Sequence, residues 1–363
     1  MGIAVSLKWK KVVIFMKKIT DYIDDRKNSF DLIRLFAALL VLYAHSYHIF
    51  GLGADPLTAI TGIYSGTIAV YMFFCISGFF ISKSVVERTP LEFIVARCAR
   101  IFPALFFCNL FTITLILPWV LVDRSWFDFV FSLESVSYIY INTSLLWGLE
   151  FTMPIVFDAH PDQAVNGSLW TLPVELQAYV LVFLFFALGW FSNKVRFNTI
   201  VCVILYTYVE YPSFYNLLIP LSSSHALFLA FLIGSALYIN KDWLPIDRRS
   251  LLTSLILAWT TYLLDYRLIS LFLFCYMLLS LGFLFKGNRL RLSNDYSYGI
   301  YLYAYPMSQL SFHFFSNNFY FYFIFILLGV VFFSYISWHF FEKPIMHFSK
   351  TLLSRKNEKI IIT

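Results

Sequence analysis

Long apolar segments, separated by short polar and basic stretches, recur along the whole chain. The first runs from Phe30 to Gly51, close to the ~20 residues that an α-helix needs to cross a bilayer. With it, nine further segments predict ten membrane-spanning helices, at residues 66–82, 101–122, 168–191, 198–211, 224–240, 251–264, 268–285, 296–315 and 319–341. The pattern therefore predicts an all-α, polytopic integral membrane bundle.

The composition agrees with this class of protein. The 363 residues are 60% hydrophobic and only 13% charged, with a mean hydropathy of +0.73, unlike any soluble globular domain of this size. The net charge of +6 suggests nucleic-acid binding, but the basic residues separate the apolar segments instead of forming one patch. We therefore expect membrane lipids, and no nucleic acid, among the partners.

The basic residues also predict the topology. Ten crossings with a cytoplasmic N-terminus place 25 of the 27 Lys and Arg residues on the inner side, all but Arg124 and Arg267. Residues 1–29 are then a cytoplasmic segment with a second possible start at Met16, residues 30–345 the transmembrane domain and residues 346–363 a cytoplasmic tail. Region 123–167 lies on the outer surface, or enters the membrane and returns, because one more crossing would invert every later loop.

The charged residues inside the first segment are the first candidate site. Arg34 and His45 are eleven residues apart, so a helix presents both on one face, ~16 Å apart along its axis. Ionisable groups at membrane depth are costly and usually functional. His45, with His48 nearby, could take a proton from a hydroxyl nucleophile. The alternative is a core histidine hydrogen-bonded to a neighbouring helix.

The basic flank of the third segment is the second candidate. Arg97 and Arg100 are neighbours if their segment is helical, and two guanidinium groups could then clamp phosphates. The alternative is that they only anchor the cytoplasmic side. At the other end of the domain, Glu342 and Pro344 are expected to end the last helix.

The motif NGSLWTLPVE is the third candidate, with Asn166 and Ser168 as a predicted helix cap. Glu175 follows Ser168 by about two turns and so lies on the same predicted face. Its carboxylate could orient or charge-balance His45, or contact the hydroxyls of an acceptor; the alternative is a Glu that reaches back to the interface. Tyrosines within residues 296–306 form either a structural aromatic seam or a ligand wall.

These motifs, in this order, resemble the membrane acyltransferase-3 family, which includes bacterial O-antigen O-acetyltransferases. The matching positions are Arg34 with His45, FFCISGFF, RCAR at Arg97 to Arg100, SLWTLPVE, SYGIYLYAYP and EKP at Glu342. The resemblance implies a ten-helix membrane enzyme in which His45 is the catalytic histidine. It also implies that Arg34, Arg97 and Arg100 bind the acyl-coenzyme donor and that Glu175 is the acidic residue of the outer motif. Many members carry a histidine where this chain has Ala304.

The expected function is O-acetylation. An acetyl group passes from cytoplasmic acetyl-CoA, a co-substrate and not a bound cofactor, to a hydroxyl of a lipid-linked or surface polysaccharide, such as an O-antigen. The acceptor is expected near Ser168, Trp170 and Glu175, no metal is expected, and the expected location is the bacterial inner membrane. The mechanism can be direct transfer or an acyl-histidine relay. The oligomeric state is also open, with a homo-oligomer as one possibility. The rivals are another short acyl donor, or a transporter without chemistry, whose signature would be internal repeats.

Overall fold

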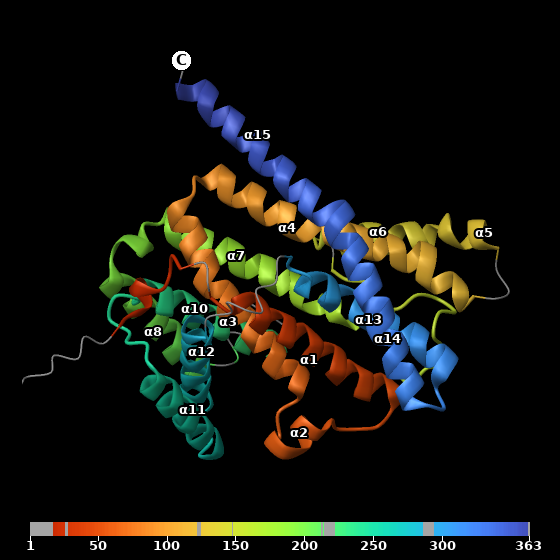
Figure 1. The fold of residues 1–363 in the computed structure, drawn as a ribbon, viewed down its shortest axis with the longest axis horizontal. Coiled ribbons are helices and arrows are strands. Elements are labelled where there is room, and N and C mark those ends of the chain that lie inside the picture. Colours follow the sequence, from red (N-terminus) through yellow and green to blue (C-terminus); the bar gives the residue numbers. More distant parts are fainter. Residues whose placement is uncertain are drawn as a thin grey trace, which may run out of the picture.

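The computed structural model describes residues 17–25, 28–121, 125–146, 148–211, 213, 222–285 and 294–361. Every regular element in these ranges is helical, and they contain no strand (Figure 1). The predicted second start at Met16 and the predicted outer Arg124 lie outside the described residues, as does the basic loop 286–293. The prediction of an all-α fold is confirmed for the part that is described.

Each predicted span falls on a helix. The longer helices are α1 (Phe30–Phe50), α3 (Ser65–Glu87), α4 (Pro90–Phe111), α6 (Leu133–Ser144), α7 (Thr171–Ala187), α8 (Lys194–Glu210), α10 (Ser222–Ile239), α11 (Arg248–Leu263), α12 (Arg267–Leu284), α13 (Ser297–Phe315), α14 (Phe319–Ile336) and α15 (Lys343–Ile361). Two short ones are α2 (Pro56–Thr61) and α5 (Trp126–Val130).

Six helical stretches of the described chain are long and apolar enough to cross a membrane. They are Phe30–Phe50, Ser65–Glu87, Pro90–Trp119, Gly167–Ala187, Arg267–Leu284 and Phe319–Ser354. The stretch Ser224–Ile239 is apolar but shorter. These helices identify a polytopic membrane protein, while the count of ten crossings and the cytoplasmic termini stay predictions.

Helix α4 begins at Pro90, eleven residues before the predicted start of the third span. Thr89 caps it: its hydroxyl accepts a hydrogen bond from the Glu92 amide at 3.3 Å, and the Glu92 carboxylate accepts one from the Thr89 amide at 3.0 Å. This reciprocal capping box, followed by Pro90 in the first turn, starts a helix well ahead of the apolar run. Arg97 and Arg100 therefore lie inside a helix.

The last helix does not end at Glu342 and Pro344, and that prediction is wrong. A π-helical turn, Ser337–Glu342, joins α14 to α15, and the helix continues to Ile361. Pro344 is the second residue of α15, directly after the π turn, where the regular hydrogen-bond ladder is already interrupted. Its missing N–H therefore does not stop the helix, and α15 extends past α4 (Figure 1).

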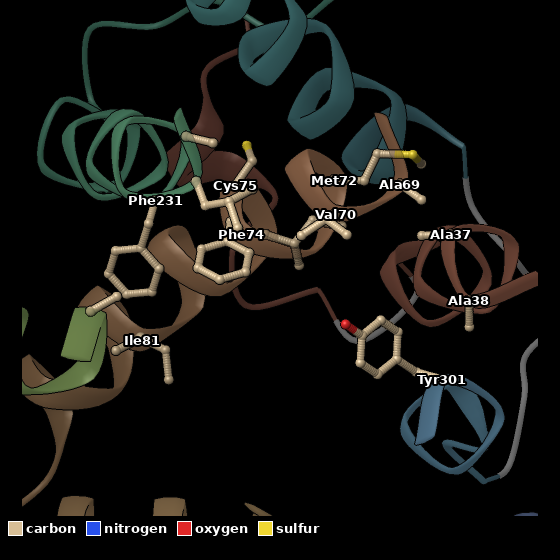
Figure 2. Packing of buried hydrophobic residues seen from close by; sticks show 14 of the residues in the cluster. Ala37, Ala38, Ala69, Val70, Met72, Phe74, Cys75, Ile81, Phe231 and Tyr301 are labelled. Carbon is tan, nitrogen blue, oxygen red and sulfur yellow. The ribbon is translucent and has the colours of Figure 1, made fainter. Parts of the chain in front are cut away.

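The core of the bundle rests on close contacts of α3, which packs against α1 and α10, while α1 also packs against α13. Figure 2 shows Ala37 and Ala38 on α1 and Ala69 on α3 near this centre, with Tyr301 extending from α13. A Cβ atom on Gly78 of α3 would lie 2.0 Å from the backbone oxygen of Phe231 on α10. Such small residues let membrane helices approach until their backbones touch.

Gly78→Ala should therefore destabilise the protein. The added methyl group meets rigid backbone and must push α3 and α10 apart, which costs about 1–3 kcal/mol. We expect a lower melting temperature in detergent. Gly329→Ala is the matched control, because a Cβ there meets only the flexible end of the Met307 side chain. Equal melting of the two variants would contradict this account of the contact.

A second, smaller core supports region 125–166. Its buried side chains come from the end of the α4 stretch, from α6 and from the segment that follows, and include Ile113, Leu117, Tyr138, Val156 and Val165. Helix α6 has 12 residues, about 18 Å, too short for a crossing. This core holds the irregular segment before Gly167 against the bundle, where its Asp162 bonds to Tyr305 and His48.

Candidate active site

The candidate site has two ends, both carried by α1. This helix is unbroken from Phe30 to Phe50 and ends at Gly51, whose φ of 78° suits glycine. The continuous helix confirms the predicted geometry: Arg34 and His45 lie on one face, ~16 Å apart. We call them the arginine end and the histidine end.

At the arginine end is a cavity of about 900 Å³, bounded by side chains of α1, α3, α4, α7, α13 and α15. Its lining brings together four of the predicted site residues, Arg34, Arg97, Arg100 and Glu175. Six basic and four acidic side chains line the cavity. Besides the four residues just named, the basic ones are Lys83, Arg88 and Lys350 and the acidic ones are Glu87, Glu92 and Asp295. The cavity is therefore net positive and of a size that suits a large anionic ligand.

Arg100 already has partners within the protein. Its guanidinium group binds Asp295 at 2.6 Å and the buried Glu342 at 3.4 Å, and lies 5.2 Å from the ring centre of Tyr298. Burial raises the pKa of the Asp295 carboxyl, but the charges of Arg100 and Arg34 outweigh it and hold that pKa below its usual range. Arg100 thus stabilises the wall of the cavity and has little left to offer a ligand.

Arg97 differs from Arg100 although both lie in one motif. Its Nε atom is buried and has no hydrogen-bond partner among the described residues. A buried donor without an acceptor is costly, which makes this guanidinium group a natural place for an anionic ligand. Arg34 lines the same cavity: its ion pair with Asp31 is a long 3.5 Å contact, and its guanidinium group lies 5.6 Å from the ring centre of Phe80.

Glu175 lies at the arginine end instead of beside His45. Its Oε1 atom accepts hydrogen bonds from the Tyr179 hydroxyl and, at 3.5 Å, from the Ser77 hydroxyl. Among the described residues it has no contact with His45, so the structure does not support the expectation that Glu175 orients the imidazole.

Ser168 and Trp170 belong to the turn that precedes α7. As predicted, the Asn166 side chain caps this turn, accepting a hydrogen bond from the Ser168 amide at 3.2 Å. Ser168 is buried outside the cavity; its carbonyl accepts a 2.8 Å bond from the Tyr301 hydroxyl, and its own hydroxyl has no partner in the described chain. Trp170 is partly buried. Neither shares its surroundings with Glu175.

At the histidine end, two tyrosines flank His45. The ring of Tyr305 meets the imidazole edge to face, with ring centres 4.9 Å apart, and the Tyr64 hydroxyl lies 3.4 Å from Nδ1. His45 is only partly buried and does not line the arginine cavity. The imidazole is thus neither sealed in apolar packing nor open to the arginine end.

The carboxylate near this imidazole is Asp162. Its Oδ2 accepts hydrogen bonds from the Tyr305 hydroxyl at 2.5 Å and from His48 at 3.1 Å. The bond from His48 is the largest of the effects that hold the pKa of the Asp162 carboxyl well below its usual range, so it is ionised at neutral pH. Neither Asp162 nor Tyr64 is among the predicted site residues.

Helix α13 joins the two ends. Tyr298 lies against Arg100, Tyr305 lies against His45, and Tyr301 stands between them on the same face, at spacings of three and four residues. Tyr298 and Tyr301 line the cavity. Tyr303 points to the other side and stacks on Phe333, with ring centres 5.4 Å apart. The tyrosine motif is therefore a site wall on one face and a packing seam on the other.

Tyr301 lines the cavity from α13, about one helical turn before Tyr305 of the histidine end. Its hydroxyl bonds to the Thr171 hydroxyl at 2.6 Å and to the Ser168 carbonyl, and its ring packs against Phe73. Ala304, where many family members carry a histidine, is fully buried. Among the described residues that line the cavity there is no histidine.

A basic cavity thus lies at one end of α1 and an imidazole at the other, within a helical membrane bundle of the kind expected for an acyltransferase. Comparison with known families agrees: residues 27–339 match the acyltransferase-3 family, described as an acyltransferase domain. This chain belongs to that family.

Curated relatives support the same class. An O-acetyl transferase of Shigella phage Sf6 is 36% identical over 160 residues, which cover 43% of this chain and 45% of that protein. Nodulation protein 10 of Rhizobium leguminosarum bv. viciae is 35% identical over 162 residues, 42% of each chain. The matches thus span under half of the length of these relatives. No solved structure matches this chain significantly.

Proposed function

We propose that this protein is a membrane O-acetyltransferase that moves an acetyl group from cytoplasmic acetyl-CoA to a hydroxyl of an extracytoplasmic polysaccharide, such as an O-antigen, in the bacterial inner membrane. The observation that carries this proposal is the buried Nε atom of Arg97, which has no partner among the described residues, in a net positive cavity, on a bundle whose α1 carries His45 ~16 Å from Arg34. Membership of the acyltransferase family and the phage relative support the reaction class.

The arginine end is the proposed donor site. Arg97, through its unpartnered Nε, and Arg34 are the proposed ligands of the acetyl-CoA phosphates, and Lys83, Arg88 and Lys350 line the same cavity. Glu175 and Asp295 are there too, so the phosphates must lie nearer the basic side chains. The long pantetheine arm suits the ~16 Å separation of the two ends, and Tyr301 of the cavity lining lies on α13 between Tyr298 and Tyr305.

The histidine end is the proposed reaction centre. His45 takes the proton of the acceptor hydroxyl, whose oxygen attacks the acetyl carbonyl carbon. The C–S bond breaks, the thiolate takes the proton back from His45, and the products are the acetyl ester and free CoA. An acetyl-histidine relay gives the same products in two steps. Ser168 and Trp170 remain the proposed acceptor residues; they belong to the turn Gly167–Trp170, whose Gly167 lies against the ring of Tyr305.

Arg97→Ala tests the donor site. Loss of one charge-assisted hydrogen bond, worth about 1.5–3 kcal/mol, should raise the Kd for acetyl-CoA about ten- to a hundredfold. The measurement is binding of acetyl-CoA to the purified chain in detergent. Arg196→Ala, which removes an exposed arginine of α8 away from the cavity, is the control. An unchanged Kd in Arg97→Ala would remove Arg97 from the donor site.

The reaction itself is tested on purified wild-type protein with acetyl-CoA and envelope polysaccharide from the host. Release of free CoA thiol together with ester-linked acetyl on the glycan is the expected result. Protein that binds the glycan but releases no thiol would favour the transporter. Faster release from succinyl-CoA than from acetyl-CoA would keep the enzyme and change the donor.

A further inference from the structure

We propose that Tyr305 and Asp162 form a positioning pair that holds the imidazole of His45 in its reactive orientation. The Asp162 carboxylate fixes the Tyr305 hydroxyl, and the Tyr305 ring then fixes the rotation of His45. This inference rests on the proposed role of His45 as the base. It adds two residues that lie outside the motifs of the donor site, on region 123–167 and on α13.

The Asp162 carboxylate is rigidly held. Besides Tyr305 and His48 on Oδ2, its Oδ1 atom accepts a 2.9 Å hydrogen bond from the amide of Ala164. Three donors on one carboxylate leave it little freedom to turn. The hydroxyl of Tyr305 is in turn committed to Asp162, so the ring of Tyr305 keeps one position beside His45.

The backbone that carries Asp162 is tied to α13, the helix that carries Tyr305. Gln309 is fully buried on α13, and its Nε2 donates 2.7 Å hydrogen bonds to the carbonyl oxygens of both Asp162 and Ala164. Its Oε1 lies 2.9 Å from Nδ1 of His160. The loop and the helix thus form one unit, and the Asp162–Tyr305 bond is not a chance contact of a surface loop.

Two glycines make room for the tyrosines beside His45. A Cβ atom on Gly167 would lie 2.6 Å from a ring carbon of Tyr305, and one on Gly66 would lie 2.6 Å from a ring carbon of Tyr64. Neither glycine has a positive φ, so space and not backbone conformation accounts for glycine at these positions. The chain therefore places both rings by leaving out side chains next to them.

The contact between Tyr305 and His45 cannot itself carry a proton, because it is an edge-to-face ring contact and the hydroxyl is engaged elsewhere. Its effect is on orientation. Small misplacements of a reacting group cost large factors in rate, whereas donor binding at the arginine end should not respond. A positioning role therefore predicts a fall in kcat with an unchanged KM for acetyl-CoA.

The test compares Tyr305→Phe, Asp162→Asn and the double variant as purified full-length proteins, with acetyl-CoA and the host polysaccharide. Each single variant should lower kcat about tenfold and leave the KM for acetyl-CoA within about twofold. The double variant should lose no more than either single one, because the two residues act as a unit. Asp158→Asn, which changes an exposed aspartate of the same loop, is the matched control and should behave as wild type.

Gly167→Ala provides a second test that removes no functional group. It should displace the Tyr305 ring and give the same fall in kcat, with melting temperatures recorded to separate misplacement from unfolding. Wild-type kcat in both single variants, or losses that multiply in the double variant, would overturn the pair.

His45→Ala, measured alongside, separates the two proposals. If it is inactive while Tyr305→Phe and Asp162→Asn equal wild type, only the positioning pair fails. Full activity of His45→Ala would overturn both the pair and the proposed base.

Discussion

Alanine at position 45 is expected to lower acetyl transfer by about a hundred- to ten-thousandfold, the range for loss of a general base, while acetyl-CoA still binds with nearly wild-type affinity. The expected split follows from the separation of the two ends: the imidazole contacts Tyr305 and Tyr64 but does not line the donor cavity. The measurement is ester-linked acetyl on the host glycan, with Kd for acetyl-CoA measured on the same preparation.

His347→Ala is the matched control, since this histidine is exposed on α15 and does not line the cavity. It should transfer acetyl groups as wild type does. Normal acetylation by His45→Ala would assign the base to another residue, and a parallel loss of acetyl-CoA binding would mean that the two ends are not independent.

Arg100→Ala should cost far more stability than Arg97→Ala. It leaves two carboxylates without their cation, including Glu342, which is only 2% exposed. Breaking a buried ion pair from one side typically costs about 3–5 kcal/mol, so we expect a large drop in melting temperature and poor recovery from membranes. Arg97→Ala removes a guanidinium group with an unpartnered Nε and should melt close to wild type.

A double variant tests whether the carboxylates left without a cation cause this loss of stability. Glu342→Gln in the Arg100→Ala background removes one of the stranded charges and should restore part of the lost stability, as a double-mutant cycle would register. If Arg100→Ala instead melts like wild type and weakens acetyl-CoA binding as much as Arg97→Ala, then Arg100 is a donor ligand and not a wall of the cavity.

The fold is predictable from the sequence wherever the signals are local. The bounds of α1 follow from an apolar run that starts after Ser29 and ends at Gly51, whose conformation ends the helix. The predicted helix bounds are wrong where the same residue type, proline, can start, end or continue a helix. Pro90 starts α4 inside a capping box, and Pro344 does not stop α15, because the π turn before it has already broken the regular ladder.

The site is predictable only in part. The relation of Arg34 to His45 depends on one continuous helix, so the spacing alone suffices. Ser168 and Glu175 are separated by about two turns, as expected, but only Glu175 lines the cavity: Ser168 lies in the 3₁₀ turn Gly167–Trp170, ahead of α7, which begins at Thr171.

Contacts distant in the sequence leave no signal in the spacing. Arg97 and Arg100 look alike in the sequence, and only their surroundings tell them apart. The partners of Arg100, Asp295 and Glu342, come from segments 195 and 242 residues away. Asp162 and His48 likewise meet across 114 residues.

The tyrosines of α13 have a consequence for how this chain can vary. Between Tyr298 and Tyr305 the helix rises about 10.5 Å and makes nearly two turns, and this pitch keeps the charged end and the imidazole end in phase. Replacing one aromatic residue by another on this face leaves the number of residues, and so the relative orientation of the two ends, unchanged. Gain or loss of a single residue between them would swing one end through about 100°, so length is the more constrained property of α13.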